Sequence, residues 1–274
     1  MAKSLRIGAV ACPAIVNDSE QNIATIATWA KQAAKLQVQL LLFPELSITG
    51  YHMQESQLQT LQAESATCQV LAKLAREVNL ILAVGMAWLD RATGEKYLAH
   101  GLWLPSGEYY IYRKTHLGER EKKLYMPGNV LPVFALPQVA VGIEMCLEQH
   151  FPEISQTLAL RGAELLLCPH AVPRLTPQER RDRWYISLRA RAYDNCVYVL
   201  ATNQVGGNGQ GIEYSGGILL VDPSGQVIAE DFSGKPAMIT ADINLSQIMA
   251  VRTTPQGMCR RFYATSRRTE LYEW

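Results

Sequence analysis

The sequence predicts an α/β fold with a mixed sheet or two packed sheets and helices on the outside. Apolar segments of strand length alternate with amphipathic segments of helix length through most of the 274 residues. Turn sequences such as Thr93-Gly94 and Ser106-Gly107 separate neighbouring strand-like segments, which indicates antiparallel hairpins among the β-α-β units. No linker or shift in composition divides the chain, so we expect a single domain over residues 1–274.

The first half of the chain contains two expected helices. Asp18 is placed to cap the first, whose apolar face is formed by Ile23, Ile26, Ala27, Ala30 and Ala34. The second is expected over Ser65–Val78. Strands are expected over Leu5–Ala11, Val38–Phe43, Leu80–Trp88, Tyr97–Leu104, Glu108–Lys114, Val133–Leu136 and Val139–Glu144. The unbroken apolar run Val38–Phe43 is typical of a strand covered on both faces.

The second half repeats this alternation. A helix over Phe151–Arg161 ends at Gly162, and Pro177 suits the first turn of a helix that runs to about Asp194. Gly206–Gly211 is glycine-rich but lacks a phosphate-binding pattern, so we interpret it as a mobile rim loop. Strands are expected over Glu164–Cys168, Cys196–Asn203, Gly217–Val221, Val227–Ala229 and Ala237–Ile243.

Charge and hydropathy argue against two classes of partner. Lys plus Arg number 26 and Asp plus Glu number 25, so a nucleic-acid footprint or a polybasic membrane patch is not expected. The densest basic stretch, Arg180 to Arg191, is interpreted as a solvated helix face. No segment approaches the ~20 apolar residues of a membrane span, and the apolar run before Cys12 is too short for a signal peptide. We therefore expect a cytoplasmic protein.

Cysteine and histidine spacing does not predict a disulfide framework or a metal site. The six cysteines, at positions 12, 68, 146, 168, 196 and 259, contain no Cys-x-x-Cys pair. The five histidines show no zinc-binding spacing. We therefore expect no metal and no cofactor.

Three reactive side chains each follow an apolar strand-like segment, where ligands meet the scaffold in open α/β folds. They are Glu45 in the segment 42–46, Lys114 in the segment 112–117, and Cys146 in the segment 142–153. Each also has a simpler interpretation: Glu45 as a helix cap, Lys114 as a surface lysine, and Cys146 as a core thiol.

Jointly, these segments resemble the nitrilase superfamily of carbon–nitrogen hydrolases. The family's three blocks occur in order as Pro44-Glu45, Arg113–Leu117, and Cys146 followed by Phe151-Pro152-Glu153. The resemblance covers nearly the whole chain, with further landmarks at residues 50–51, 127–128, 189–195 and 267–272. It implies a four-layer α-β-β-α sandwich of the nitrilase type and a homodimer or larger homo-oligomer.

The resemblance also implies a role for each of the three residues. A free cysteine has a pKa of ~8.5, so Cys146 needs the cation Lys114 and the base Glu45 to become a nucleophile. Glu45 would take the thiol proton, pass it to the leaving amine, and then activate water. Lys114 and the backbone N–H of Leu147 would stabilise the oxyanion.

A fourth catalytic residue of this family is often a second glutamate. Glu119 and Glu121 are the candidates, and the spacing to Pro127-Gly128 matches the family pattern for Glu121. The alternative is that both glutamates are surface residues of a charged loop without a catalytic role.

The sequence departs from the family pattern close to the nucleophile. Leu147, Glu148 and His150 stand where many members have Tyr, Asp and Arg, and the loop from His116 to Pro127 is short. The spacing of Cys146 and His150 raises a Cys–His dyad as a rival mechanism. These departures leave the substrate open. The residues expected to line the substrate pocket, with packing as the alternative for each, are Tyr51, Tyr125, His170, Trp184 and Asn203.

The sequence therefore predicts a hydrolase that cleaves a small amide or N-carbamoyl compound through a cysteine thioester and releases ammonia. Nitrile hydrolysis or acyl transfer on the same site is the alternative within the superfamily. A catalytically idle binding protein on this fold is the alternative from another class.

Overall fold

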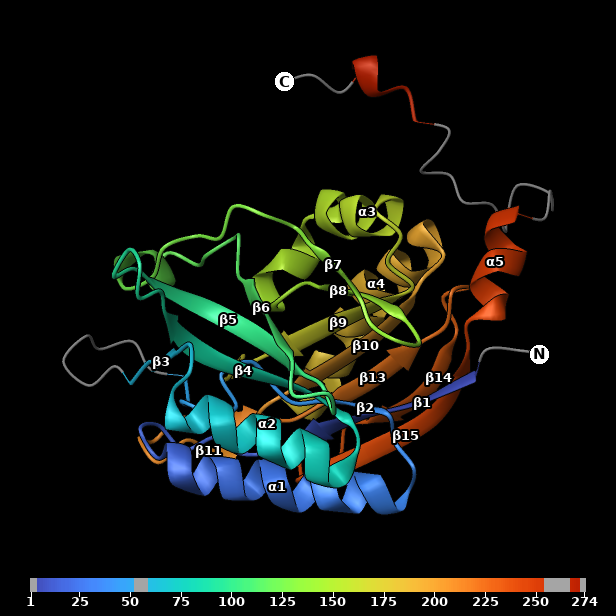
Figure 1. The fold of residues 1–274 in the computed structure, drawn as a ribbon. Helices are drawn as coiled ribbons and strands as arrows, with labels where there is room; N and C mark the ends of the chain where they lie inside the picture. Colours follow the sequence, from blue (N-terminus) through green and yellow to red (C-terminus); the bar gives the residue numbers. More distant parts are fainter. Residues whose placement is uncertain (1–3, 52–58, 254–266, 272–274) are drawn as a thin grey trace.

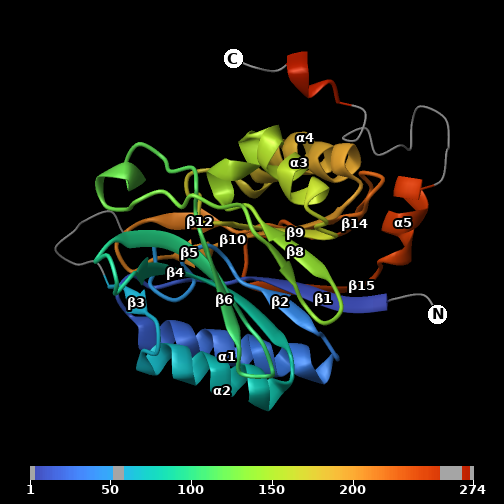
Figure 2. The same cartoon turned by 45° about the horizontal axis from the view of Figure 1, so that its top comes forward.

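The computed structural model describes residues 4–51, 59–253 and 267–271. Two sheets pack face to face, with helices on both outer surfaces (Figure 1). The first sheet has the order β15-β1-β2-β4-β5-β6, with the short β3 beside β4. The second has the order β14-β13-β10-β9-β8-β7. Helices α1 (Ser19–Lys35) and α2 (Ala66–Val78) cover the first sheet, while α3 (Pro152–Leu160) and α4 (Pro177–Asn195) cover the second (Figure 2).

The strands lie close to their expected positions. Those of the first sheet are β1 (Ser4–Ala11), β2 (Leu40–Leu42), β3 (Leu61–Gln62), β4 (Ile81–Leu89), β5 (Lys96–Trp103), β6 (Tyr109–Arg113) and β15 (Ala237–Asn244). Those of the second are β7 (Val133–Ala135), β8 (Ala140–Ile143), β9 (Leu165–His170), β10 (Tyr198–Asn203), β13 (Ile218–Val221) and β14 (Val227–Asp231). The sequence analysis did not predict β3, the hairpin of β11 (Val205–Gly207) with β12 (Glu213–Ser215), or helix α5 (Ser246–Thr253).

Alternating side chains explain the four layers. In β2, Leu40 and Leu42 join the core between the two sheets, whereas Leu41 joins the core beneath α1 and α2. In β9, Leu165 and Leu167 face the first sheet, whereas Leu166 packs beneath α3 and α4. Because successive side chains point to opposite faces, a strand apolar on both faces must be covered twice. The expected α-β-β-α sandwich is confirmed.

The first helix follows its expected pattern. The side chain of Asp18 accepts the N–H of Gln21 at 3.0 Å and so caps the N-terminus. Ile26 and Ala30 are buried on the predicted face of α1, together with Ala33. Among the described residues, no helix combines the length and the apolar character needed to cross a bilayer.

Candidate active site

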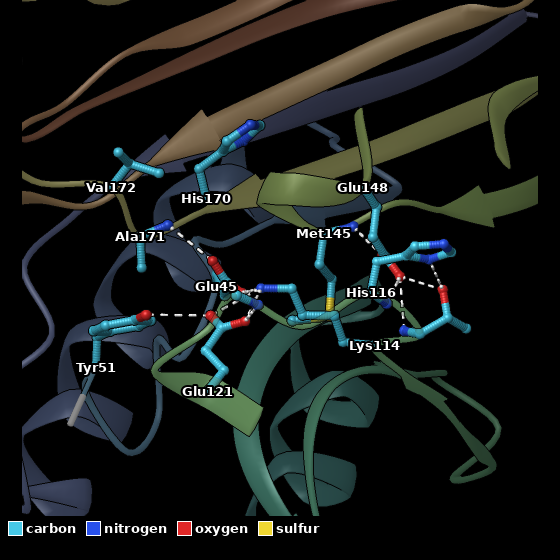
Figure 3. Close-up of polar contacts among 12 residues, drawn as sticks. Glu45, Tyr51, Lys114, His116, Glu121, Met145, Glu148, His170, Ala171 and Val172 are labelled. Carbon is cyan, nitrogen blue, oxygen red and sulfur yellow. Dashed lines mark hydrogen bonds and ion pairs between the residues drawn. The ribbon is translucent and has the colours of Figure 1, made fainter. Parts of the chain in front are cut away.

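Lys114 lies at the centre of a buried group of charged side chains (Figure 3). Its Nζ donates to Glu45 Oε1 at 2.9 Å and to both carboxylate oxygens of Glu121 at 3.0 Å. Glu45 and Lys114 are almost completely buried, and Glu121 is 5% exposed. Solvent and salt screen such a group much less than they screen a surface ion pair. One ammonium is therefore shared between two carboxylates.

The strand directions explain why these residues meet. Glu45 follows β2 and Lys114 follows β6, and both strands run parallel to β4 and end at the same edge of the first sheet. Gly85 in β4 allows the turn that carries Glu45 to pass close by, because a Cβ at Gly85 would collide with the backbone N of Leu46. The glycine therefore lets Glu45 turn inward directly after its strand.

Glu45 is also held on its other side. Its Oε2 accepts the backbone N–H of Ala171 at 3.1 Å, and its carbonyl oxygen accepts Nε2 of Gln204 at 2.8 Å. Burial raises the pKa of Glu45, although Lys114 opposes this rise. Burial alone would lower the pKa of Lys114, but the neighbouring carboxylates hold that pKa above its ordinary value. The site thus combines a permanent cation with a carboxyl group of increased basicity.

The two candidate glutamates lie in different surroundings. Glu121 begins a short 3-10 helix, η2 (Glu121–Lys123), and accepts Tyr51 OH at 3.2 Å and the N–H of Gly118 at 2.8 Å, besides its bonds to Lys114. The side chain of Glu119 is 88% exposed and pairs with Lys122 at 2.6 Å. The structure thus brings Glu121 into the charged group and leaves Glu119 in solvent. The catalytic role of Glu121 stays a prediction.

Cys146 lies three residues beyond the end of β8, at the start of the 3-10 helix η3 (Cys146–His150). Its φ of 46° is in the left-handed region, which costs a non-glycine residue about 1–3 kcal/mol. Burial and the nearby Glu45 raise the pKa of its thiol to about 12, although Lys114 and Arg180 oppose this rise. The expectation that Lys114 favours ionisation holds, but Lys114 does not outweigh burial, so the thiol needs a base.

Glu148 connects the cysteine segment to the lysine segment, a role that the sequence analysis missed. Its Oε2 accepts the N–H of Met145 at 2.6 Å. Its Oε1 accepts Tyr112 OH at 2.7 Å, and it accepts both the N–H and the Oγ1 of Thr115, at 2.7 and 2.6 Å. The side chain is fully buried. The available signal was an acidic residue two positions after the cysteine.

Arg180 corrects the interpretation of Arg180 to Arg191 as a solvated helix face. Arg180 is only 3% exposed, and its Nη2 donates to the carbonyl of Val172 at 2.7 Å. Burial lowers its pKa to about 10, and the nearby Cys146 opposes this shift. The first residue of the basic stretch thus faces inward from α4, because the loop after β9 covers it.

The Cys–His dyad gains no support from the geometry. His150 is at the far end of η3 from Cys146 and is exposed to solvent. Within the described parts of the chain, no hydrogen bond joins the two side chains.

A cavity of about 560 Å³ lies above the charged group. Its walls include Glu45, Glu121 and Cys146, and Tyr51 lines it as expected. The other lining residues, which the sequence analysis did not identify, are Arg120, Ala171, Val172, Pro173, Arg174, Gln210, Ile212 and Tyr214. Gln210 belongs to the glycine-rich segment that was interpreted as a rim loop, and the remaining positions have no local sequence signal.

The other predicted pocket residues do not line this cavity, which corrects the expectation. Tyr125 lines a neighbouring cavity of about 490 Å³, together with Leu147. The backbone N–H of Leu147 as an oxyanion donor stays a prediction. His170 is buried with its Nδ1 2.8 Å from the carbonyl of Cys168, and its ring packs against Trp184. Asn203 is buried too, and its Oδ1 accepts the N–H of Val172 at 2.8 Å. His170, Asn203 and Trp184 therefore lie behind the cavity wall, because β9, β10 and α4 place them in the interior.

The described residues contain no group of three His, Cys, Asp or Glu side chains arranged to hold a metal ion. Lys114 pairs with both carboxylates of the site, Glu45 at 2.9 Å and Glu121 at 3.0 Å.

Comparison with known proteins gives matches over nearly the whole chain. The amidase from Nesterenkonia sp. AN1 superposes with a TM-score of 0.80 at 26% identity, covering 97% of this chain and 95% of that one. The deaminated glutathione amidase of Rattus norvegicus is 30% identical over 86% of this chain and 76% of its own length. The N-carbamoylputrescine amidase of Arabidopsis thaliana is 26% identical over 94% and 90%. The carbon-nitrogen hydrolase family model matches residues 6–253. This chain therefore belongs to the carbon–nitrogen hydrolases of the nitrilase superfamily, enzymes that act on C–N bonds other than peptide bonds.

Proposed function

We propose that this chain hydrolyses a small amide or N-carbamoyl compound through a thioester on Cys146 and releases ammonia. The observation that carries the proposal is the convergence of three chain segments on one cavity. Glu45 and Cys146 both line it, and Lys114 is bonded to Glu45 directly behind the wall. No two of these residues are neighbours in the sequence, so the cluster exists only in the folded chain.

The first half of the reaction forms the thioester. Sγ of Cys146 attacks the carbonyl carbon while Glu45 accepts the thiol proton, which the raised pKa of the thiol makes necessary. Lys114 and the backbone N–H of Leu147 donate to the oxyanion, and such donors typically contribute about 3 kcal/mol each. Glu45 then gives the proton to the departing nitrogen. The C–N bond breaks, and ammonia leaves.

The second half restores the enzyme. Glu45 accepts a proton from water, whose oxygen attacks the thioester carbon. The C–S bond breaks, the carboxylic acid forms, and the thiolate regains the proton from Glu45. No oxidant or further reactant is consumed.

Solved structures of a relative support the cysteine as nucleophile. One structure of the Nesterenkonia amidase contains butyramide. Another, of a variant, shows covalent addition of the acetamide moiety of fluoroacetamide at the active-site cysteine of that protein. These findings concern the relative, and they support a nucleophilic role for Cys146.

Ammonia release over a panel of small amides tests the proposal. We expect turnover by the parent protein, none by Cys146→Ala, and near-parental turnover by Cys68→Ala, a buried cysteine on α2. Mass spectrometry of the parent protein, quenched with acid during turnover of an active amide, should show an acyl group on Cys146. Turnover that survives Cys146→Ala overturns the mechanism, and a folded parent that hydrolyses no amide supports the idle binding protein.

A further inference from the structure

We propose that the substrate carries a carboxylate in addition to the amide, and that Arg120 and Arg174 bind this carboxylate at the cavity wall. The inference rests on the proposed function, because it places the amide at Cys146. Both arginines line the same cavity as Glu45 and Cys146. Both are exposed to solvent, so a ligand in the cavity can reach them.

Neither arginine is paired with a carboxylate in the described part of the chain. Within the described residues, the side chains of Arg120 and Arg174 form no hydrogen bond or ion pair. Other arginines of the chain are paired, such as Arg6 with Asp242 at 2.6 Å and Arg113 with Asp90 at 2.7 Å. A planar guanidinium group with all its donors available is suited to bind a carboxylate through two parallel hydrogen bonds.

The acidic residues of the cavity do not compete for this role. Glu45 and Glu121 both bond to Lys114, and both lie in the buried part of the wall. The remaining lining residues are uncharged: Tyr51, Ala171, Val172, Pro173, Gln210, Ile212 and Tyr214. A positively charged substrate group would therefore meet two cations and no unpaired carboxylate. The charge pattern favours an anionic substrate and disfavours a cationic one.

Arg174 is presented by a loop that is firmly attached. Its φ of 67° lies in the left-handed region, so the backbone holds it in a conformation unusual for arginine. Asn203 accepts the N–H of Val172, and Arg180 donates to the carbonyl of the same residue at 2.7 Å. On the other side of Arg174, Thr176 caps α4. A pre-positioned cation loses less conformational freedom on binding than one on a free loop.

Equilibrium binding to Cys146→Ala tests the inference without depending on turnover. The ligands are succinamate, butyramide and 3-aminopropanamide, which present an anionic, a neutral and a cationic end with similar length. We expect succinamate to bind most tightly and 3-aminopropanamide most weakly. In the Cys146→Ala background, Arg174→Gln and Arg120→Gln should each weaken succinamate binding about tenfold, as expected for loss of a charge-assisted contact. Butyramide binding should stay within twofold.

Two further variants serve as controls. Arg91→Gln removes an exposed arginine from the turn between β4 and β5 and should leave all three affinities unchanged. Arg174→Lys retains the charge and should recover part of the succinamate affinity. Equal binding of succinamate and butyramide, or equal loss of both in Arg174→Gln, overturns the inference. Preferred binding of succinamate without ammonia release by the parent protein would instead contradict the proposed function and leave the anion site standing.

Discussion

Glu148 and Thr115 are joined by two hydrogen bonds, from the N–H and the Oγ1 of Thr115 to the same carboxylate oxygen, at 2.7 and 2.6 Å. Thr115 directly follows Lys114, and Glu148 follows Cys146 by two residues. The carboxylate thus ties the segment of the cation to the segment of the nucleophile across the two sheets. Its other oxygen accepts the N–H of Met145, on the opposite side of Cys146.

Glu148→Gln should reduce both stability and activity. In the parent protein the carboxylate accepts hydrogen bonds from buried donors, and the glutamine side chain would turn an NH₂ group, itself a donor, toward some of them. Those donors would lose their acceptor, which should cost about 2–4 kcal/mol of unfolding free energy. Misplacement of Cys146 relative to Lys114 should lower kcat more than it raises KM. Denaturant unfolding and steady-state kinetics measure the two effects. Glu153→Gln, an exposed change on α3, is the control, and a Glu148→Gln variant with parental kcat would exclude the positioning role.

Glu121→Gln should lower kcat/KM by roughly two orders of magnitude, because Glu121 holds Lys114 and Tyr51 through charge-assisted hydrogen bonds. Glu119→Gln should stay within a few-fold of the parent, since Glu119 pairs only with Lys122 at the surface. Kinetics on one amide with both variants provides the comparison. If Glu119→Gln is the impaired variant, the assignment of the fourth residue is wrong.

Activity should fall toward acid pH at a value above that of an ordinary glutamate. Burial raises the pKa of Glu45 above 4.5, and Glu45 must be ionised to accept the thiol proton. Protonation begins at a higher pH than for a free carboxyl group, so the acidic limb of kcat/KM should lie above pH 4.5. A pH profile measures this limb. A limb at or below the ordinary value would contradict Glu45 as the base.

Removal of Arg180 should make the thiol harder to ionise. Arg180 lowers the pKa of Cys146, so Arg180→Gln should raise it further. The rate of alkylation of Cys146 at neutral pH should therefore decrease, and its pH profile should move to higher pH. Arg183→Gln, an exposed neighbour on α4, is the matched control. Faster alkylation of Arg180→Gln would show that shielding by this side chain outweighs its charge.

Cys146 should be labelled first by substoichiometric iodoacetamide. It is half-buried and lines the cavity, whereas Cys12, Cys68, Cys168 and Cys196 are buried. Access rather than a low pKa distinguishes it, because burial raises the pKa of Cys146 and Cys12 alike, each to about 12. Peptide mapping identifies the label. Cys259 lies outside the described residues, and preferential labelling there or at a buried cysteine would argue against the assignment.

Amides should be cleaved faster than matched nitriles. The carboxylate of Glu121 lines the cavity and can accept the N–H of a substrate amide, for which a nitrile has no counterpart. Ammonia release from amide and nitrile pairs of equal chain length measures the preference. A nitrile that is hydrolysed faster at equal concentration would reverse the assignment.

Local sequence patterns predicted the strands and the reactive side chains of this protein. The unbroken apolar run Val38–Phe43 predicted a strand covered on both faces, and the three strand-end motifs led to Glu45, Lys114 and Cys146. Glu121 was selected over Glu119 from its spacing to Pro127-Gly128, and the structure places Glu121 in the charged group. Such signals lie within a few residues of one another, so they can be identified without the fold.

The substrate cavity required the tertiary structure. The residue types of Trp184, His170 and Asn203 are common in binding pockets, but in this fold they lie behind the cavity wall. The cavity is lined instead by residues such as Arg120 and Arg174, which come from separate loops and belong to no sequence motif. Arg180 and Arg181 are adjacent in a basic helix, yet only Arg180 is buried near Cys146. By itself, the sequence determined the α/β class and the reactive residues, because side-chain periodicity and strand-end motifs are local, and the four layers followed only from the resemblance to the family. Tertiary structure decided which side chains face the cavity, because that depends on how separate loops pack across the two sheets.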